Sequence, residues 1–353
     1  MKKNYLISTG GSGGHVLPAT ILFEHLSKEA NIIISTDKRG SKYLESNSYR
    51  VEIVNTPKLN NIFFLPINFF LILFLTIKSF FLLKREKIHK VFSTGGYMSL
   101  PVILAATLLK IEIYLIEPNH VLGRANKFFL KSCKKIFCYT KKIRNFPIKL
   151  ESKIVEINPL VREQIYELKS SNEIKDKCNL LIIGGSQGAK IFDNLKDLLI
   201  KISKDKQIRI IQQTSEKNIS SLSNYYSKNN IDNQIFSYSK DFINIVRKAN
   251  ICITRAGAST LAELSVLNIP FIAVPLPTSK DNHQLENANF YKENNCCWVI
   301  EQNQLEKKIE ELLSDILKKK TDYIEKKNSL KKLNFQNSWN NVNQKILENI
   351  NEN

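Results

Sequence analysis

Short apolar runs alternate with stretches of helical periodicity along most of the chain. The first run is Tyr5–Ile7, and residues 19–28 carry Leu22, Phe23 and Leu26 at helical spacing. A strand–helix–strand rhythm of this kind is typical of a parallel sheet covered by helices. Further strands are expected at Asn31–Ser35, Val51–Val54, Val91–Ser93, Ile113–Ile116, Ile136–Tyr139, Asn179–Ile183, Ile208–Ile211, Gln234–Phe236, Ile251–Ile253 and Phe271–Val274.

The pattern begins a second time at Asn179, with another buried strand, glycine turn and helix. A length of 353 residues also suits two domains that each bury a core. The Asn-Pro pair at 158–159 favours a turn and marks the expected crossing between them. We therefore predict an α/β protein with two Rossmann-like halves, residues 1–158 and 159–335, and a C-terminal helix within 336–353 that returns to the first domain.

Three of the expected strands end in glycine-rich turns, at residues 8–18, 94–97 and 184–189. Glycine allows backbone N–H groups to approach an anion, and a following helix adds its own unpaired N–H groups. His15 lies at the mouth of the first turn. That turn is no dinucleotide fingerprint, because Val16 stands where the third glycine belongs, and no P-loop Gly-Lys-Ser/Thr follows. We predict that these turns bind phosphate groups; a tight turn without a ligand is the alternative.

Polar residues also follow the expected strand at 113–116. Glu117, Asn119 and His120 bring a carboxylate, an amide and an imidazole to the edge where open α/β sheets bind ligands. These side chains either face a ligand or are simply solvated in a loop.

A second polar group lies in the later half of the chain. Ser259 and Thr260 open an expected helix and offer hydroxyl donors to a diphosphate. Glu263 would lie about one turn further on, where a carboxylate can accept both hydroxyls of a ribose. Amide and acidic side chains at 280–284 suit sugar hydroxyls and an N-acetyl group. A capped helix with a solvated Glu263 is the alternative.

The segment Ile62–Leu83 is the most apolar part of the chain, with Lys78 as its only charge. Its length is sufficient to span a bilayer, although Pro66 interrupts its start. The cation-rich residues 84–90 that follow suit a helix lying on an anionic membrane surface. We expect surface insertion through residues 62–90, with a buried helix and a true span as alternatives.

The formal net charge of +19 points to an anionic partner: a nucleic acid, a phosphorylated substrate or an acidic membrane. Frequent Lys, Asn and Ile suggest that compositional bias contributes to this excess. No nucleic-acid-binding module is recognisable, so we expect no nucleic acid. The six cysteines show no Cys-x-x-Cys spacing and indicate reduced thiols in a cytoplasmic protein. Too few apolar residues follow Lys2 and Lys3 for a signal peptide.

Taken together, the motifs resemble one family of inverting glycosyltransferases. That family transfers N-acetylglucosamine from UDP-N-acetylglucosamine to the 4-hydroxyl of undecaprenyl-pyrophosphoryl-N-acetylmuramyl pentapeptide in peptidoglycan synthesis. The resemblance implies an α/β GT-B fold, with two Rossmann-like parallel-sheet domains facing a cleft. It also implies a peripheral hexosyltransferase on the cytoplasmic face of the cell membrane, whose first domain takes the lipid acceptor. The matching segments are Gly10–His15, Thr94–Tyr97, Glu117–Asn119, Asn158–Arg162, Gly184–Ala189, Arg255–Glu263 and Asp281–Ala288.

The resemblance also implies roles for single residues. His15 matches the histidine considered for the acceptor side and for the general base. Contacts to the UDP-sugar are implied at Ser12, Gly13, Gly14, Asn119, Arg162, Ser186, Ser239, Ala258, Ser259, Thr260, Leu261, Ala262, Glu263 and Gln284.

This chain departs from the family pattern in two places. Ile116 stands where the family has a histidine, and the Asn-Pro-x-Arg motif that ends at Arg162 is one residue longer. No Asp-x-Asp occurs, so neither a metal clamp of that kind nor another cofactor is expected. The alternatives are a different lipid acceptor, a UDP-sugar epimerase, and a membrane-docked scaffold that binds a nucleotide sugar without chemistry.

Overall fold

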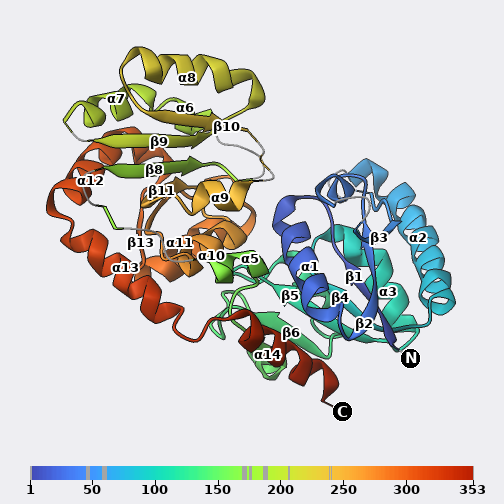
Figure 1. Ribbon diagram of the computed structural model, residues 1–353. Coiled ribbons are helices and arrows are strands. Elements are labelled where there is room, and N and C mark those ends of the chain that lie inside the picture. The colour runs from blue at the N-terminus through green and yellow to red at the C-terminus, as the bar shows by residue number, and fades with distance from the viewer. Residues whose placement is uncertain are drawn as a thin grey trace. The chain divides into compact units, whose positions relative to one another are not determined.

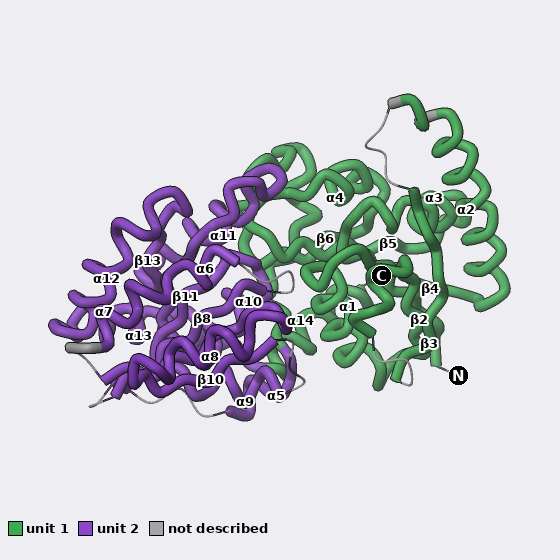
Figure 2. Tube along the Cα trace, turned by 90° about the horizontal axis from the view of Figure 1, so that it is seen from above, with its two compact units in different colours: residues 1–161, 339–353 green, residues 162–338 purple. Residues whose placement is uncertain are grey.

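The computed structural model describes residues 2–44, 48–57, 62–168, 173–174, 177–185, 190–205, 207–237, 239 and 241–352. The chain divides into two compact units, shown in green and purple in Figure 2. The first unit contains residues 1–161 together with 339–353, and the second contains residues 162–338. The sequence placed these boundaries after residues 158 and 335.

The first unit is built on a seven-stranded parallel sheet in the order β3-β2-β1-β4-β5-β6-β7 (Figure 1). Its chain starts at β1 inside the sheet, adds β2 and β3 on one side and then β4 to β7 on the other, as in a doubly wound fold. The strand β7 was not expected, because its three residues are only half-buried and carry no apolar run. The strands are β1 Lys3–Ser8, β2 Ala30–Thr36, β3 Arg50–Ile53, β4 Ile88–Ser93, β5 Glu112–Glu117, β6 Lys135–Cys138 and β7 Ile154–Glu156.

Helices cover both faces of this sheet, so alternate residues of one strand belong to different cores. Leu6 of β1 packs on the side of α2, α3 and α4, whereas Ile7 packs on the side of α1 and α14. The C-terminal helix α14 is therefore part of the first unit. These helices are α1 Gly13–Leu26, α2 Leu65–Arg85, α3 Leu100–Leu108, α4 Arg124–Phe129 and α14 Trp339–Asn351.

The first helix begins earlier than the expected residue 19. The Ser12 carbonyl already accepts the N–H groups of His15 and Val16, at 3.0 and 3.2 Å. Glycine and proline are poor helix formers, but the burial of Val16 and Ala19 in the core outweighs their low propensity. Residues 13–15 are consequently the first turn of a helix and not part of a loop.

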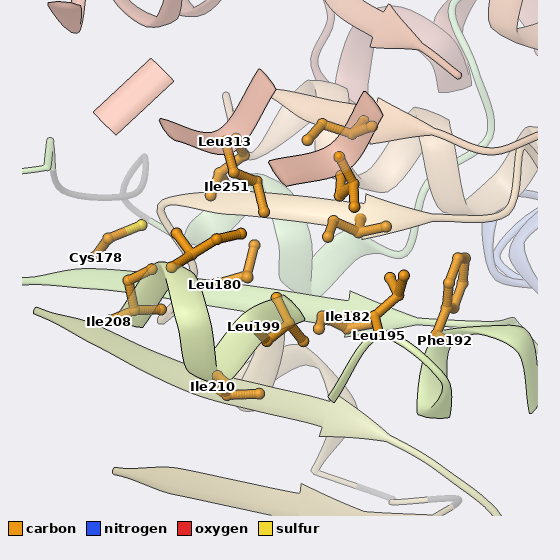
Figure 3. Close-up of a cluster of buried hydrophobic side chains, with 14 of the residues drawn as sticks. Cys178, Leu180, Ile182, Phe192, Leu195, Leu199, Ile208, Ile210, Ile251 and Leu313 are labelled. Atoms are coloured by element: carbon orange, nitrogen blue, oxygen red, sulfur yellow. The ribbon is translucent and has the colours of Figure 1, made fainter. Parts of the chain in front are cut away.

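The second unit holds a six-stranded parallel sheet in the order β10-β9-β8-β11-β12-β13. Figure 3 shows its core, where Leu180 and Ile182 of β8 pack with Leu195 and Leu199. The strands are β8 Cys178–Ile183, β9 Ile208–Gln213, β10 Asn233–Phe236, β11 Ile251–Thr254, β12 Phe271–Ala273 and β13 Cys297–Val299. The helices are α5 Glu163–Glu167, α6 Lys190–Asp193, α7 Lys196–Asp205, α8 Ile219–Lys228, α9 Phe242–Val246, α10 Ala258–Val266, α11 His283–Glu293, α12 Leu305–Lys319 and α13 Thr321–Leu333.

The single helix expected after the third glycine turn is in fact two helices, α6 and α7. The break follows Asp193, whose carboxylate accepts hydrogen bonds from Gln212, Thr214 and Asn218 at 2.9, 2.8 and 3.1 Å. These contacts join the end of α6 to β9 and to the turn after it, so the chain starts a new helix at Lys196.

Candidate functional site

The first glycine turn joins β1 to α1 in a conformation that only glycine adopts easily. Gly11 has φ +80°, and a Cβ at this position would overlap the side chain of the buried Met98. Its N–H donates to Asp37 Oδ1 at 2.8 Å. The next glycines, Gly13 and Gly14, open α1, where the first N–H groups of a helix have no partner within it. The N-cap residue Ser12 makes no side-chain capping bond, so its hydroxyl is not used to close the helix.

His15 lies in the first turn of α1 and contacts the second glycine turn. Its Nδ1 is 2.8 Å from the Thr94 carbonyl oxygen. A carbonyl can only accept, so Nδ1 carries the proton, and Nε2 of the neutral ring keeps a lone pair. His15 is thus oriented so that Nε2 can accept a proton.

The loop after β5 is organised by Glu117, which is 2% exposed. Its Oε1 accepts the backbone N–H and the side-chain amide of Asn119, at 3.2 and 3.0 Å. Its Oε2 accepts the Gly123 N–H at 2.8 Å and the Asn126 amide at 2.9 Å. The conformation of the loop that carries Asn119 therefore depends on a buried carboxylate.

The two residues beside this motif that depart from the family pattern are both buried. Ile116 belongs to the core between the sheet, α1 and α14, so its side chain is not at the loop. Burial lowers the pKa of His120 to about 4, which keeps that imidazole neutral near neutral pH.

In the second unit, two predicted residues that are far apart in sequence form an ion pair. Arg162 Nε and Nη2 donate to Glu263 Oε1 and Oε2, at 2.8 and 2.9 Å. Burial raises the pKa of Glu263, and Arg162 opposes this rise. A carboxylate offers about four acceptor sites, so Glu263 can accept two more bonds while it keeps Arg162. The motif that ends at Arg162 is one residue longer than in the family, and its guanidinium nevertheless pairs with Glu263.

The start of α10 contains a buried hydroxyl with no partner. Gly257 is the N-cap, and Ser259 Oγ makes no hydrogen bond within the part of the chain that the structure describes. The side chains of Leu261 and Ala262 are fully buried in the core, so a ligand could reach only their backbone atoms. Ala258 and Thr260 complete this first turn and are partly exposed.

The amide of Gln284 links two loops at the edge of the second sheet. Its Oε1 accepts the N–H groups of Ala256 and Leu276, at 3.2 and 3.0 Å. Its Nε2 has no partner among the described residues and remains available as a donor. Ser239 Oγ accepts the Asp241 N–H at 3.1 Å, so this hydroxyl already caps a turn. The predicted contact Ser186 lies outside the described residues.

The sequence did not single out Asp37 and Arg39, although both adjoin the first glycine turn. The sequence feature that could have pointed to them is a cluster of polar and charged residues directly after β2, at the carboxyl edge of the sheet. In the described ranges, no group of three or more His, Cys, Asp or Glu side chains could hold a metal ion.

Two family models match most of the chain. The glycosyltransferase family 28 N-terminal domain matches residues 5–138, and the family 28 C-terminal domain matches residues 179–342. A curated relative from Pelagibacter ubique is 47% identical over the full length of both chains. One from Rickettsia felis is 36% identical, with 90% of each chain covered. Both are named UDP-N-acetylglucosamine–N-acetylmuramyl-(pentapeptide) pyrophosphoryl-undecaprenol N-acetylglucosamine transferase.

Solved structures with little sequence identity share the fold. MurG from Acinetobacter baumannii superimposes with a TM-score of 0.76 at 22% identity, covering 99% of both chains. The UDP-GlcNAc 2-epimerase from Neisseria meningitidis bound to UDP-GlcNAc gives 0.67 at 12% identity, covering 99% of this chain and 100% of the other. At these identities the likeness concerns the arrangement of strands and helices alone.

Proposed function

Because the chain belongs to glycosyltransferase family 28, we propose that it transfers N-acetylglucosamine from UDP-N-acetylglucosamine to a lipid-linked acceptor. The acceptor is undecaprenyl-pyrophosphoryl-N-acetylmuramyl pentapeptide, and the enzyme is a hexosyltransferase of peptidoglycan synthesis. The observation that carries this proposal is the 47% identity, over the full length, to a relative named for this reaction.

We propose that the second unit binds UDP-N-acetylglucosamine, and this role is supported by groups there that lack a hydrogen-bond partner or can accept further hydrogen bonds. Glu263 can accept the ribose hydroxyls, since Arg162 uses only part of its carboxylate. The unpartnered Ser259 hydroxyl and the first turn of α10 suit the diphosphate. Gln284 Nε2 suits a sugar hydroxyl. The other proposed donor contacts are Ser12, Gly13, Gly14, Asn119, Ser186, Ser239, Ala258, Thr260, Leu261 and Ala262.

The reaction is a single in-line displacement that inverts the sugar. His15 Nε2 takes the proton of the acceptor's 4-hydroxyl while that oxygen attacks C1 of N-acetylglucosamine, and UDP leaves with the bonding electrons. The Thr94 carbonyl accepts the hydrogen bond that Nδ1–H donates, and it stabilises the imidazolium that forms. Backbone N–H groups at helix starts stabilise the departing diphosphate.

The test is a transfer assay with UDP-N-acetylglucosamine and the muramyl lipid in detergent, with the His15→Ala variant alongside. We expect glycosylated lipid and UDP from the unaltered chain, and turnover lower by about a hundredfold or more in His15→Ala. UDP affinity should be nearly unchanged in the variant. Wild-type turnover in His15→Ala would remove His15 from the mechanism, and UDP release without sugar transfer would contradict the transferase.

We also propose peripheral attachment to an anionic membrane surface on the cytoplasmic side, through residues 62–90. The helix α2 is long and apolar enough to cross a membrane, but one of its faces packs on α3 in the fold (Figure 1). The uncharged polar residues Asn68, Thr76 and Ser79 lie on that buried face among apolar side chains, whereas the exposed face is apolar apart from Lys78 and the cations of the last turn. The exposed side chains of α2 include Ile67, Phe69, Phe70, Leu71, Leu73, Phe74, Ile77 and Phe81, and Phe63 and Phe64 are exposed in the turn before it.

An exposed apolar face is the opposite of what a helix on a water-facing surface shows, and it favours contact with lipid. A cavity of about 660 Å³ beside α2 is lined by apolar side chains, by Glu52 and by three cations, Lys78, Lys84 and Arg85; the excess of cations suits anionic headgroups. Cytoplasmic placement is supported by six free, buried cysteines.

A further inference from the structure

Arg39 stands at the carboxyl edge of the first sheet, where three adjacent strands end. It follows β2, the Gly10–Gly11 turn follows β1, and Tyr97 follows β4; β1 lies between the other two strands. Arg39 Nη2 donates to the Tyr97 hydroxyl, so the side chain passes over the end of β1. The same Nη2 is 3.7 Å from the position that a Cβ of Gly11 would take. The guanidinium therefore lies against the first glycine turn.

Asp37 holds this guanidinium in place from the buried side. Asp37 Oδ2 accepts Arg39 Nε and Nη2 at 3.0 and 2.8 Å, while Oδ1 accepts the N–H groups of Gly11 and Gly40 at 2.8 and 2.9 Å. Burial alone would raise the pKa of Asp37, but these four bonds outweigh it and lower the pKa below its ordinary value. An ionised carboxylate thus fixes the arginine before any ligand arrives.

The other side of the guanidinium is open. The side chain of Arg39 is 44% exposed, whereas that of Asp37 is only 7% exposed. Nη1 makes no hydrogen bond within the described ranges of the chain, so its two N–H groups are available as donors beside the glycine turn. Planar guanidinium groups with paired free donors bind phosphate oxygens well.

His15 and Arg39 both contact the second glycine turn, His15 through Thr94 and Arg39 through Tyr97. In the proposed acceptor, the diphosphate and the attacking 4-hydroxyl are attached to opposite ends of one sugar ring. A base at the 4-hydroxyl therefore places the acceptor's diphosphate roughly one sugar ring away, where a cation would stabilise it. Arg39 is fixed in the same unit as His15, whereas the proposed ribose-binding carboxylate, Glu263, lies in the second unit.

We propose that Arg39 binds the diphosphate of the lipid-linked acceptor, with its free Nη1 N–H groups donating to a phosphate oxygen. This inference rests on the proposed function, because it identifies the side chain that receives the anionic group of that acceptor. Asp37 is a positioning residue here: it touches no substrate and fixes the orientation of Arg39.

The experiment measures KM for both substrates, with a short-chain, water-soluble acceptor so that membrane binding has no influence. Arg39→Ala should raise the acceptor KM by about tenfold to a hundredfold and leave the UDP-N-acetylglucosamine KM within about twofold. Arg39→Lys should recover part of the loss. The matched control is Arg50→Ala, which removes an exposed arginine that pairs with Glu86 in the same unit; both KM values should stay unchanged.

Competition by inorganic pyrophosphate distinguishes a role of Arg39 in ligand binding from a purely structural role. Pyrophosphate should compete with the acceptor in the unaltered enzyme and compete about tenfold or more weakly in Arg39→Ala. If Arg39 only stabilises the turn, the variant will lose kcat and thermal stability with no selective change in acceptor KM, which would overturn the proposal. Failure of the unaltered chain to glycosylate either acceptor would instead overturn the proposed function itself.

Discussion

The carboxylate of Glu263 links the geometry of the second unit to donor binding. Glu263→Ala removes the partner of Arg162 and the proposed acceptor of the ribose hydroxyls. We expect UDP to bind about tenfold to a hundredfold more weakly, because a charged hydrogen bond contributes about 1.5–3 kcal/mol. Isothermal titration calorimetry with UDP measures this. Glu293→Ala, which removes an exposed carboxylate at the end of α11, is the control and should bind UDP normally.

At the level of single residues, some contacts could be predicted from the sequence and others could not. Spacing after a strand was enough to select Asn119 and Glu263 as candidates, because parallel strands bring their carboxyl ends to one edge; their contacts with a ligand stay a prediction. It did not reveal that Glu117 accepts four hydrogen bonds and holds the loop of Asn119. Nor did it reveal that Arg39, after β2, crosses the end of β1 to reach Tyr97, after β4. Both facts depend on which strands are adjacent, and a periodic pattern does not contain the order of strands.

Among the elements, the strands were the easiest to predict from the sequence. Strands buried on both faces are continuous apolar runs, and most expected strands agree with the observed bounds to within one or two residues. Helix boundaries were harder, because they depend on tertiary contacts. The burial of Val16 extends α1 back through its glycines, and the bonds of Asp193 to β9 and the turn after it separate α6 from α7.

The apolar exposed face of α2 leads to a prediction about membrane attachment. The double variant Phe74→Ser, Phe81→Ser replaces two side chains that are each 64% exposed, so the fold should be retained. Burying a phenylalanine in lipid contributes about 1.5–3 kcal/mol, so cosedimentation with phosphatidylglycerol vesicles should weaken by more than tenfold. Phe335→Ser, at a position 86% exposed in the second unit, is the control.

Extraction with alkaline carbonate then distinguishes a helix that lies on the membrane surface from one that crosses the membrane. A helix lying on the surface should release the protein, whereas a spanning helix should retain it in the membrane pellet. Retention of the unaltered chain would contradict peripheral attachment, and unchanged vesicle binding of the double variant would contradict the role of α2.

The helix α14 contributes a pH dependence to stability. It packs Trp339 on His25 with ring centroids 3.6 Å apart, and its Asn343 hydrogen-bonds His25. Burial lowers the pKa of His25 to about 4, although this hydrogen bond opposes the shift. Below the unfolded-state pKa near 6.5 the unfolded chain binds a proton that the folded chain excludes. The free energy of unfolding should therefore fall between pH 6.5 and 4, by at most about 1.4 kcal/mol per pH unit for this group.

Urea unfolding at pH 7, 6 and 5 measures this slope. His25→Phe keeps an aromatic ring against Trp339 and removes the titrating group, so its slope should be smaller. It should not vanish, because the pKa of His120 is also lowered to about 4. Equal slopes for the unaltered chain and the variant would show that His25 does not contribute.

At the scale of the whole molecule, the first unit is formed by two separate parts of the chain. The second unit is continuous and has its own core, whereas the first requires α14, which returns after residue 338. Val342, Ile346 and Ile350 of α14 are buried against the first sheet. Removing three aliphatic side chains of this kind costs about 5–9 kcal/mol, at 1.5–3 kcal/mol each. That loss is comparable with the entire stability of a typical domain.

We therefore expect the two units to behave differently as fragments. Residues 162–338 should unfold cooperatively by circular dichroism and should bind UDP, because Arg162, Ser259 and Glu263 are all present. Residues 1–161 alone should show no cooperative transition at 25 °C. The same segment joined to residues 339–353 by a flexible linker should recover one, since α14 then returns to its place in the core. Equal stability of the first-unit fragment with and without α14 would contradict this role of the C-terminal helix.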